Sequence, residues 1–488
     1  MMSFAVTLAQ LAERYGALIT DQTEITQVYQ NSADVTSGSI FFALPGATTH
    51  GAKHAQMAIA NGAVAIITDD IGAEMISTSI PVIKVDNPRY ELAQVAKLVY
   101  GPQIADMHLW GITGTNGKTT TSYMLRAMLP QPAAAIGTTG IVTNSSREPL
   151  ARTTPEIDDL YRLLIKVRKD GIKKIVMEVS SHALVLDRVT GLEFQAVAFT
   201  NLSQDHLDFH GTMDAYLQAK ARLFDTKFSK YAVVCTDTAE GVAIADLAEA
   251  NGLVVSTVTS TNQSGTWWTT DAVIGIDDIS AVIQPLGLKL ELSMGGSFNI
   301  ANALTAIAMA DQVSEISPTQ LKRLAELQVP GRMQSIFSNG IHAIVDYAHS
   351  PAAIAAVIAE LRSSVSGKLL VVIGAGGDRD ASKRPLMGSA LAGADLVIVT
   401  DDNPRTEDAS QIRAQIILGI DAIGVSYQEI ADRRAAILAA VSEVKSSNDL
   451  VAVLGKGHEQ GQQIGNETYP FDDLAELRAA ILNRASNE

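Results

Sequence analysis

The sequence of this chain is organised around the stretch LWGITGTNGKTTT at residues 109–121. An apolar run leads into a glycine-rich turn, then Lys-Thr-Thr, and then a predicted helix through Tyr123, Leu125 and Met128. Glycines let backbone N–H groups converge on phosphate oxygens, and a helix N-terminus adds the positive end of its dipole. Lys118 can reach the β and γ oxygens, and the Thr119 hydroxyl can ligate Mg²⁺. This stretch therefore predicts a nucleotide-binding domain built on a phosphate loop.

The phosphate loop is a variant of the strict pattern. Counting back from Lys118, the first glycine of that pattern falls on Ile112. A glycine-rich turn beside a chance lysine is the alternative that the spacing alone leaves open. The candidate phosphate-binding residues are Gly114, Thr115, Asn116, Gly117, Lys118, Thr119 and Thr120.

Length and composition restrict the class of protein. The chain has 488 residues, which predicts about three domains, and 47% of them are hydrophobic. A net charge of −16 argues against a nucleic-acid binder with a basic surface. A single cysteine, Cys235, suits the reducing cytoplasm. Residues 1–6 do not resemble a signal peptide, and no apolar segment has membrane-spanning length, so we expect a cytoplasmic protein without membrane contact.

Alternating strand and helix patterns predict a small α/β domain at residues 1–102, which the Gly101-Pro102 pair would end. No catalytic cluster stands out in it. Turn-forming residues occur at Asn31-Ser32, where ordinary loop chemistry is the simpler reading.

The middle of the chain carries several candidate polar groups. A buried strand at residues 175–179 delivers Glu178, in the position of a Mg²⁺ ligand, although any strand can carry an acid. Another strand runs into residues 200–211, where two histidines and two aspartates follow closely. The next predicted helix, residues 214–224, carries Lys220, which on its own reads as a solvated lysine. The stretch 256–266 reads as irregular, and a hairpin is predicted at Leu286-Gly287.

The last 150 residues predict a second α/β unit with polar clusters after three strands. These clusters are GAGGDRD at 374–380, DDNPR at 401–405 and GKGHE at 455–459. The first departs from a dinucleotide-binding turn, because its third glycine would fall on Arg379. Loops at the carboxyl ends of parallel strands line one crevice, and both charge signs there suit a zwitterionic substrate.

Taken together, these motifs resemble the Mur ligase family of bacterial cell-wall enzymes over nearly the whole chain. The residues that carry the resemblance are TGTNGKTT at 113–120, EVSSH at 178–182, NLS at 201–203 with DHLD at 205–208, Asn299, PGR at 330–332 and DYAH at 346–349. Within the family, TTP at 153–155, GDR at 377–379, DNPR at 402–405 and GHE at 457–459 resemble the members that add the third residue of the stem peptide.

The resemblance implies three α/β domains: a UDP-substrate domain at 1–102, a P-loop-type ATP domain with a mostly parallel sheet at 103–332, and a Rossmann-like amino-acid domain at 333–488. It implies an ATP-dependent ligase of peptidoglycan synthesis, acting as a monomer. ATP would phosphorylate the D-glutamyl γ-carboxylate of UDP-N-acetylmuramoyl-L-alanyl-D-glutamate. The amine of meso-diaminopimelate would then attack the acyl phosphate.

Nucleotide and metal roles follow from the same resemblance. Thr119, Glu178 and His206 would hold Mg²⁺, and Lys220 would be carbamylated to supply an anionic oxygen ligand. Asn299 would contact adenine, and Arg332 with Asp346 would complete the nucleotide site. Lys118, Lys220, His206 and Glu178 are thus the implied catalytic residues.

The implied substrate-binding residues lie in all three regions of the sequence. They are Ser32, Thr153, Thr154, Ser180, Arg188, Arg379, Asp402, Asn403, Pro404, Arg405, Gly455 and Glu459. Arg405 decides the choice of amino acid, because a guanidinium binds the distal carboxylate that diaminopimelate has and lysine lacks. Glu459 would accept the distal ammonium. L-lysine or another diamino acid is the alternative substrate.

The chain departs from the family pattern at two places. Asn31-Ser32-Ala33 replaces the Asp-Ser-Arg of many relatives, so an arginine is missing from the predicted UDP site, and Leu186 replaces a polar residue of some relatives. A folylpolyglutamate synthetase-like ligase is a more distant alternative that would not need residues 402–405. A P-loop switch or motor would leave the C-terminal polar clusters unexplained.

Overall fold

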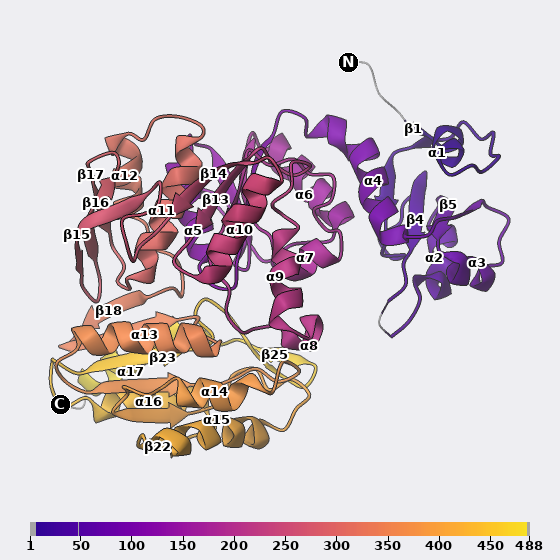
Figure 1. Ribbon diagram of the computed structural model, residues 1–488. Helices are drawn as coiled ribbons and strands as arrows, with labels where there is room; N and C mark the ends of the chain where they lie inside the picture. The colour runs from indigo at the N-terminus through magenta and orange to yellow at the C-terminus, as the bar shows by residue number, and fades with distance from the viewer. Residues whose placement is uncertain (1–5, 47, 486–488) are drawn as a thin grey trace. The chain divides into compact units, whose positions relative to one another are not determined.

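The computed structural model describes residues 6–46 and 48–485 (Figure 1). Its backbone forms two compact units: Met1–Gly111, Gln131–Gln195 and Asp225–Lys230 make the first, and Ile112–Pro130, Ala196–Phe224 and Tyr231–Glu488 make the second. Residues 1–5, on which the signal-peptide prediction rests, lie outside the described ranges. Within those ranges, no helix combines the length and apolarity needed to span a bilayer.

The N-terminal part of the first unit is the small α/β fold that the sequence predicts. Its parallel sheet has the order β3-β4-β5-β6. Helix α4 begins at Pro88, whose fixed φ suits a first helical turn, after Asn87 caps the helix by accepting from the Tyr90 N–H. The elements are β1 (Val6–Thr7), α1 (Leu8–Arg14), β2 (Glu24–Ile25), β3 (Gln27–Tyr29), β4 (Ser39–Ala43), α2 (Ala55–Ala60), β5 (Ala63–Thr68), α3 (Asp70–Met75), β6 (Val82–Lys84) and α4 (Pro88–Tyr100).

Further strands of the first unit form a sheet in the order β10-β9-β8-β11-β7, with β8 and β11 parallel, and the last two residues of β7, Ile112 and Thr113, belong to the second unit. These elements are β7 (His108–Thr113), β8 (Ala133–Gly137), β9 (Gly140–Val142), β10 (Arg147–Glu148), α6 (Ile157–Lys169), β11 (Lys174–Glu178) and α7 (Ser181–Val185). Every residue of β8 is buried, as expected for a strand covered on both faces.

The second unit contains the parallel strands β12-β13-β14 and a three-stranded antiparallel sheet, β15-β16-β17. The predicted hairpin at residues 286–287 is confirmed, and Gly287 has the positive φ of 66° that such a turn needs. The prediction of irregular structure is wrong for residues 256–258, which pair with β13. The elements are α5 (Lys118–Met128), β12 (Ala196–Phe199), α8 (Leu207–His210), α9 (Met213–Ala221), β13 (Tyr231–Cys235), α10 (Ala239–Ala250), β14 (Val254–Val258), β15 (Trp268–Ile274), β16 (Ile279–Gln284), β17 (Leu288–Leu292), α11 (Phe298–Asp311) and α12 (Pro318–Ala325).

The C-terminal part of the second unit is a doubly wound sheet in the order β18-β19-β23-β20-β21-β22. Only β18, at one edge of this sheet, runs antiparallel to its neighbour. Its elements are β18 (Gln334–Ser338), β19 (Ile341–Asp346), α13 (Pro351–Ser364), β20 (Leu369–Ile373), α14 (Lys383–Ser389), β21 (Leu396–Val399), α15 (Ala409–Ile423), β22 (Tyr427–Glu429), α16 (Arg433–Glu443), β23 (Leu450–Leu454), β24 (Gln462–Ile464), β25 (Glu467–Tyr469) and α17 (Asp473–Ala485).

Alternate residues of the central strand β20 build two cores. Val371 packs in the cluster that α13 and α15 cover, and Val372 packs in the cluster that α16 and α17 cover. Helices therefore lie on both faces of the sheet (Figure 1). Because β23, β20 and β21 are parallel neighbours, the three polar clusters after them meet at one edge of the sheet, as predicted.

Candidate nucleotide and amino-acid site

The predicted phosphate loop, residues 114–117, connects β7 to α5. Gly114 and Gly117 have φ values of 146° and 83°. A Cβ at Gly114 would lie 1.9 Å from Thr200 Oγ1, and one at Gly117 would lie 2.3 Å from Asn302 Oδ1. Both space and backbone conformation therefore require glycine. The loop and the N-terminus of α5 together form a geometry suited to binding phosphate.

The segment after β12 holds this loop in place. Thr200 Oγ1 donates to the Asn116 carbonyl at 2.6 Å, and Asn201 Oδ1 accepts from the Asn116 N–H at 2.9 Å. Thr115 Oγ1 accepts from the Ser203 N–H at 3.0 Å. Thr115, whose N–H also donates to the Asn201 carbonyl at 2.9 Å, and the backbone of Asn116 thus fix the shape of the loop.

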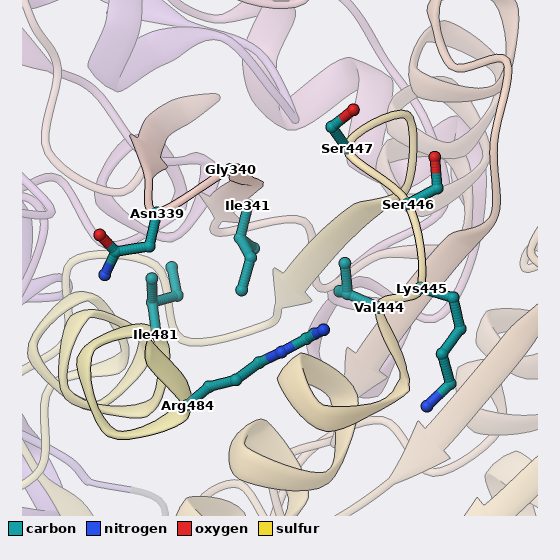
Figure 2. Close-up of a pocket in the computed structure, with 9 residues that line it drawn as sticks. All are labelled: Asn339, Gly340, Ile341, Val444, Lys445, Ser446, Ser447, Ile481 and Arg484. Atoms are coloured by element: carbon teal, nitrogen blue, oxygen red, sulfur yellow. The ribbon is translucent and has the colours of Figure 1, made fainter. Parts of the chain in front are cut away.

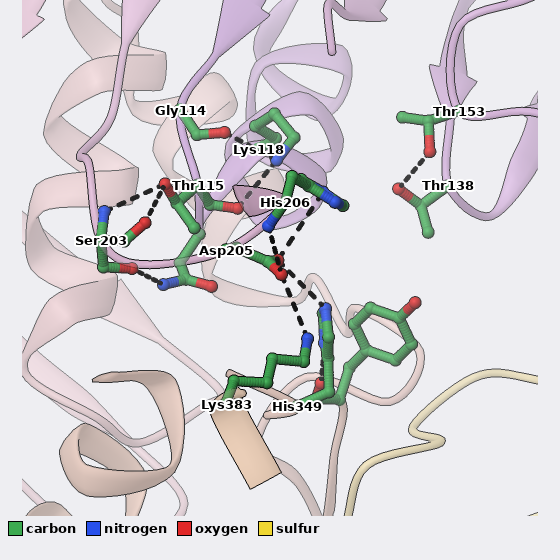
Figure 3. Close-up of polar contacts among 12 residues, drawn as sticks. Gly114, Thr115, Lys118, Thr138, Thr153, Ser203, Asp205, His206, His349 and Lys383 are labelled. Atoms are coloured by element: carbon green, nitrogen blue, oxygen red, sulfur yellow. Dashed lines mark hydrogen bonds and ion pairs between the residues drawn. The ribbon is translucent and has the colours of Figure 1, made fainter. Parts of the chain in front are cut away.

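Two lysines converge on one carbonyl of the loop. Lys118 Nζ donates to the carbonyls of Gly114 and Thr115, both at 2.8 Å (Figure 3), and Lys220 Nζ donates to Gly114 O at 2.8 Å. Lys220 is only 1% exposed, so the alternative of a solvated helix lysine is wrong. Burial, with the nearby Lys118 charge, lowers the pKa of Lys220 well below its usual range, although Asp205 opposes this.

Asn299, predicted to contact adenine, lies in the first turn of α11 and is buried. Its Nδ2 donates to the Gly295 carbonyl at 2.7 Å, and its Oδ1 accepts from Asn302 Nδ2 at 2.9 Å. Asn302 Oδ1 in turn accepts from Thr121 Oγ1 at 3.3 Å. Hydrogen bonds therefore connect Asn299 to the helix that follows the phosphate loop.

Arg332, which follows α12, reaches the start of α5. Its Nη2 donates to Thr119 Oγ1 at 3.2 Å, its Nη1 lies 3.2 Å from His458 Nδ1, and its guanidinium carbon lies 4.3 Å from the Tyr347 ring centroid. Asp346 ends β19 and accepts two backbone N–H groups at 2.7 Å each. Burial raises the pKa of the Asp346 carboxyl, although the Arg332 charge opposes this shift.

Asp205 joins the loop after β12 to the C-terminal region (Figure 3). Its Oδ1 lies 3.1 Å from Lys383 Nζ, and its Oδ2 lies 3.7 Å from His349 Nε2 and 3.6 Å from His206 Nε2. Although burial acts in the opposite direction, the contacts with His349, Lys383 and His206 hold the pKa of Asp205 well below its usual range. His206, a predicted metal ligand, is therefore adjacent to an anchored carboxylate.

In the first unit, Glu178 ends β11 in a polar pocket of threonines. It is buried, and it accepts from the Thr138 N–H at 3.0 Å and from Thr138 Oγ1 at 2.9 Å. Thr138 Oγ1 lies 3.3 Å from Thr153 Oγ1 (Figure 3), and Thr154 Oγ1 donates to the Glu178 carbonyl at 2.8 Å. Ser180 Oγ caps α7 by accepting from the Ala183 N–H. Glu178, Thr153, Thr154 and Ser180 thus lie close together.

Arg188 lies in an arginine cluster in the same unit. Glu156 Oε1 lies 2.7 Å from Arg188 Nη2 and 3.8 Å from Arg152 Nε, and its Oε2 lies 3.1 Å from Arg89 Nη1. Although burial opposes it, these arginines lower the pKa of Glu156. One carboxylate among three guanidinium groups leaves an excess of positive charge, which suits an anionic substrate.

Arg405, predicted to select the amino acid, has a left-handed backbone with φ of 52°. Its N–H donates to the Gln463 carbonyl at 3.1 Å, and its carbonyl accepts from the Gly465 N–H at 2.7 Å. The side-chain Nη1 donates to the Gly377 carbonyl. Its Nε and Nη2 have no hydrogen-bond partner among the described residues, so part of the guanidinium fork is available to a ligand.

Glu459 lies beside Arg405's loop in a compact charged group. Glu459 Oε2 accepts from Asn403 Nδ2 at 2.9 Å and lies 3.3 Å from Lys456 Nζ. Lys456 is fully buried and also lies 3.4 Å from Asp402 Oδ1. Two carboxylates and one ammonium leave a net charge of about −1, which an incoming ammonium can neutralise.

The remaining predicted substrate residues differ in exposure. Pro404 and Gly455 are buried near Asp402, while Arg379 is exposed on the loop that carries Gly377. Ser32 is buried in the N-terminal sheet region, where its Oγ contacts Met57 Sδ at 3.4 Å.

Mg²⁺ prefers oxygen ligands and usually keeps several waters. Thr119 and Glu178 offer such oxygens, and both are buried. Across the described residues, no group of three or more His, Cys, Asp or Glu side chains is arranged to hold a metal. The predicted Mg²⁺ ligands do not form such a group, because two of the four are a threonine and a modified lysine.

Several contacts were not predicted from the sequence. Lys456, Asp205, Lys383 and Arg384 all make buried contacts in or beside the site. The sequence signal that could have found two of them is KRP at residues 383–385. Here two cationic residues follow shortly after the glycine-rich turn at residues 374–377. Because their partners are far away in the sequence, the sequence alone did not predict these pairs.

One cavity of about 140 Å³ lies away from these clusters (Figure 2). It is lined by residues that precede β19 and β23, such as Asn339 and Ser446, and by Arg484 of α17. The polar clusters lie instead at the carboxyl ends of the same parallel strands.

Comparison with known proteins agrees with this geometry. Three family models match the chain: "Mur ligase family, catalytic domain" at residues 24–103, "Mur ligase middle domain" at 112–310 and "Mur ligase, glutamate ligase domain" at 331–457. A Corynebacterium glutamicum protein named UDP-N-acetylmuramoyl-L-alanyl-D-glutamate--2,6-diaminopimelate ligase is 43% identical, covering 93% of this chain and 91% of its own.

Solved structures also match over most of the chain. One described as a UDP-N-acetylmuramoyl-L-alanyl-D-glutamate--2,6-diaminopimelate ligase has a TM-score of 0.69 at 33% identity and covers 99% of both chains. Mycobacterium tuberculosis folylpolyglutamate synthase, complexed with ADP and AMPPCP, has a TM-score of 0.61 at 17% identity. It covers 74% of this chain, and at that identity the likeness concerns the fold alone. The predicted α/β class, with its three-domain architecture, is confirmed.

Proposed function

Because this chain belongs to the Mur ligase family, we propose that it is the ATP-dependent ligase that joins meso-diaminopimelate to UDP-N-acetylmuramoyl-L-alanyl-D-glutamate in peptidoglycan synthesis. The observation that carries the proposal is the C-terminal crevice. It places the Arg405 guanidinium on the same loop as Asn403, which contacts the Glu459–Lys456 group. These groups match the carboxylate and the ammonium that a diamino diacid carries together at its distal end.

The phosphate loop would hold the ATP phosphates. Backbone N–H groups of residues 114–120 and the Lys118 ammonium neutralise phosphate charge, and the dipole of α5 adds to this. Arg332 lies at Thr119 and stacks on Tyr347, so it can bring a further cation to the nucleotide. Asn299 would contact the adenine, and Asp346 would complete the nucleotide site.

Mg²⁺ would be held by Thr119, Glu178, His206 and a carbamate on Lys220. Bound there, the ion supplies positive charge that offsets the charge on the transferring phosphoryl group. Carbamylation needs a neutral amine, and the burial of Lys220 favours that form. The amine nitrogen attacks the carbon of CO₂ and an N–C bond forms. The π electrons of one C=O bond move to its oxygen, which gives a carboxylate, and the nitrogen loses a proton to solvent.

The UDP-linked dipeptide would bind the first unit. Ser32 is the candidate for the nucleotide end, and Thr153, Thr154, Ser180 and Arg188 are candidates for the muramoyl-dipeptide. The excess positive charge around Glu156 supports an anionic ligand at Arg188.

The chain's own residues act by positioning and charge neutralisation. The γ-carboxylate oxygen takes the terminal phosphoryl group of ATP, which gives an acyl phosphate and ADP. The free amine of diaminopimelate then attacks the carbonyl carbon, an amide bond forms, phosphate leaves with its bonding electrons, and the amine nitrogen releases one proton to solvent. Arg405 and Arg379 would hold the distal carboxylate during this step, and Glu459 the distal ammonium, while Asp402, Asn403, Pro404 and Gly455 shape the crevice.

The domain limits that we propose are 1–102 for the UDP substrate, 103–332 for ATP and 333–488 for the amino acid. The separate family matches at 24–103, 112–310 and 331–457 support this division. We further propose a monomer that works in the cytoplasm, where ATP is available and the thiol of Cys235 stays reduced.

The test is release of phosphate from ATP with each substrate omitted in turn. The ligase should release phosphate rapidly only when both UDP-muramoyl-dipeptide and meso-diaminopimelate are present. Release that is independent of both would favour a P-loop switch or motor, and release that depends on a folate and glutamate would favour a folylpolyglutamate synthetase.

The alternative amino acid is tested in the same assay. Wild-type protein should strongly prefer meso-diaminopimelate to L-lysine, and Arg405→Ala should lose that preference, because L-lysine has no distal carboxylate to accept from the half-buried Arg405 guanidinium. Equal turnover of L-lysine by the wild type would support the lysine ligase instead.

A further inference from the structure

Arg384, in the first turn of α14, is 1% exposed and lies outside the set of residues proposed above to touch a substrate. Its Nη1 and Nη2 donate to Oε2 and Oε1 of Glu407, both at 2.8 Å. Nη1 also donates to Gln415 Oε1 at 2.8 Å, and Nη2 donates to the Gly376 carbonyl at 3.1 Å. One buried guanidinium therefore binds both the 374–380 loop and the 401–407 loop.

Further contacts join the same two loops. The Asp378 N–H donates to Glu407, and the Asp378 carboxylate accepts from the Thr406 N–H at 3.2 Å and from Thr406 Oγ1 at 2.8 Å. The Gly377 N–H donates to the Asn403 carbonyl at 2.8 Å. Glu407 is thus the point at which Arg384 and the backbone of the first loop meet.

Arg405 depends on this junction for its place. Its Nη1 donates to the Gly377 carbonyl, one residue from the carbonyl that Arg384 holds. The loops approach so closely that a Cβ at Gly377 would lie 1.9 Å from the Pro404 carbonyl oxygen. Arg405 itself has an unfavourable left-handed backbone, which persists only if its surroundings impose it.

We propose that Arg384 is a specificity-determining positioning residue, which holds the two loops together so that the Arg405 guanidinium stays aimed at the distal carboxylate of the amino acid. The inference rests on the proposed function, in which Arg405 binds that carboxylate. Lysine cannot replace Arg384, because one ammonium cannot donate in parallel to both oxygens of Glu407 and also reach the other acceptors in the same fork geometry.

The experiment compares Arg384→Lys and Glu407→Gln with the matched control Arg434→Lys. Arg434 makes the same two-bond contact with Glu476, at 2.8 Å for each bond, but it is exposed and lies on α16. Arg384→Lys should raise the KM for meso-diaminopimelate by about tenfold and reduce the preference over L-lysine by a similar factor. The KM for ATP should stay near that of the control.

A double-mutant cycle with Arg405→Ala separates positioning from a general loss of structure. In the Arg405→Ala background, Arg384→Lys should change the KM for diaminopimelate by less than about twofold, because the group that it positions is gone. The proposal would be overturned if the rise in KM of the double variant equalled the product of the rises in the two single variants. An unchanged KM in both Arg384→Lys and Glu407→Gln would also overturn it. If Arg384→Lys does not fold, Glu407→Gln enters the cycle in its place.

The two hypotheses fail in different ways. If Arg405→Ala leaves the KM for diaminopimelate unchanged, the role proposed for Arg405 is refuted and this inference falls with it. If Arg405→Ala raises that KM and neither Arg384→Lys nor Glu407→Gln does, only the positioning role of Arg384 is overturned.

Discussion

The Lys383 ammonium lies 3.1 Å from Oδ1 of Asp205, although 178 positions separate the two residues in the sequence. Both side chains are about nine-tenths buried. Asp205 follows β12, and Lys383 begins α14, so one ion pair joins the phosphate-loop region to the C-terminal sheet within the second unit. The same carboxylate lies beside His206.

Lys383→Met should lower the free energy of unfolding by about 3 kcal/mol, since it leaves a buried carboxylate without its nearest cation. His349 remains 3.7 Å from Asp205, which keeps the loss at the lower end of the range for buried pairs. Urea denaturation measures the change. Lys322→Met is the control: its pair with Glu326 is 3.8 Å long and exposed, and should contribute less than about 0.5 kcal/mol. Equal losses in the two variants would contradict the assignment.

Lys220→Ala should abolish ligation, and added acetate or formate should restore part of it, because a small carboxylate can occupy the place of the carbamate. Wild-type protein in ¹³C-bicarbonate should give a carbamate carbon signal by NMR, which Lys220→Ala lacks. Circular dichroism checks that the variant is folded. A folded variant without rescue, together with a wild type without the carbon signal, would contradict the carbamate.

Gly117→Ala should weaken ATP binding by more than about tenfold, because its new Cβ would meet buried Asn302 and because its backbone is left-handed. Gly171→Ala is the matched control, since Gly171 has the same φ of 83° and a Cβ there would meet nothing within 4 Å. Calorimetric titration with ATP gives the two affinities. Equal affinities would show that the contact with Asn302 does not shape the loop.

Cys235 should resist alkylation in the folded protein at pH 8. Burial raises the pKa of its thiol to about 12, so only about one molecule in ten thousand carries a thiolate at that pH. Iodoacetamide labelling followed by mass spectrometry should be slow in the native state and complete in concentrated guanidinium chloride. Because the folded pKa is raised, the thiol also destabilises the fold as pH rises above its unfolded pKa of about 8.5. Rapid native labelling at pH 8 would contradict the buried assignment.

The order of apolar runs and turns was enough to predict the α/β class and the main strands. Residues 369–373 and 450–454 are continuous apolar runs, which is typical of parallel strands covered on both faces, and both are fully buried. The glycine-rich phosphate loop was also predicted, and its left-handed backbone at Gly114 and Gly117 is the conformation that glycine permits. The predicted irregular stretch was wrong at residues 256–258, since Ser256 and Thr257 interrupt the valines of the edge strand β14 and leave no continuous apolar run.

The sequence by itself determined the chemistry of the motifs: a phosphate loop, an acid after a buried strand, and a cationic loop after another. These are local properties, set by residue type and by the few bonds between neighbours. Only the tertiary structure decided which charges are buried and paired. Lys220 reads as solvated in its helix yet lies on the phosphate loop, and Arg384 meets Glu407 only after α14 packs against α15. Burial and long-range pairing depend on the whole fold, because desolvation and Coulomb energies are fixed by three-dimensional neighbours rather than by sequence neighbours.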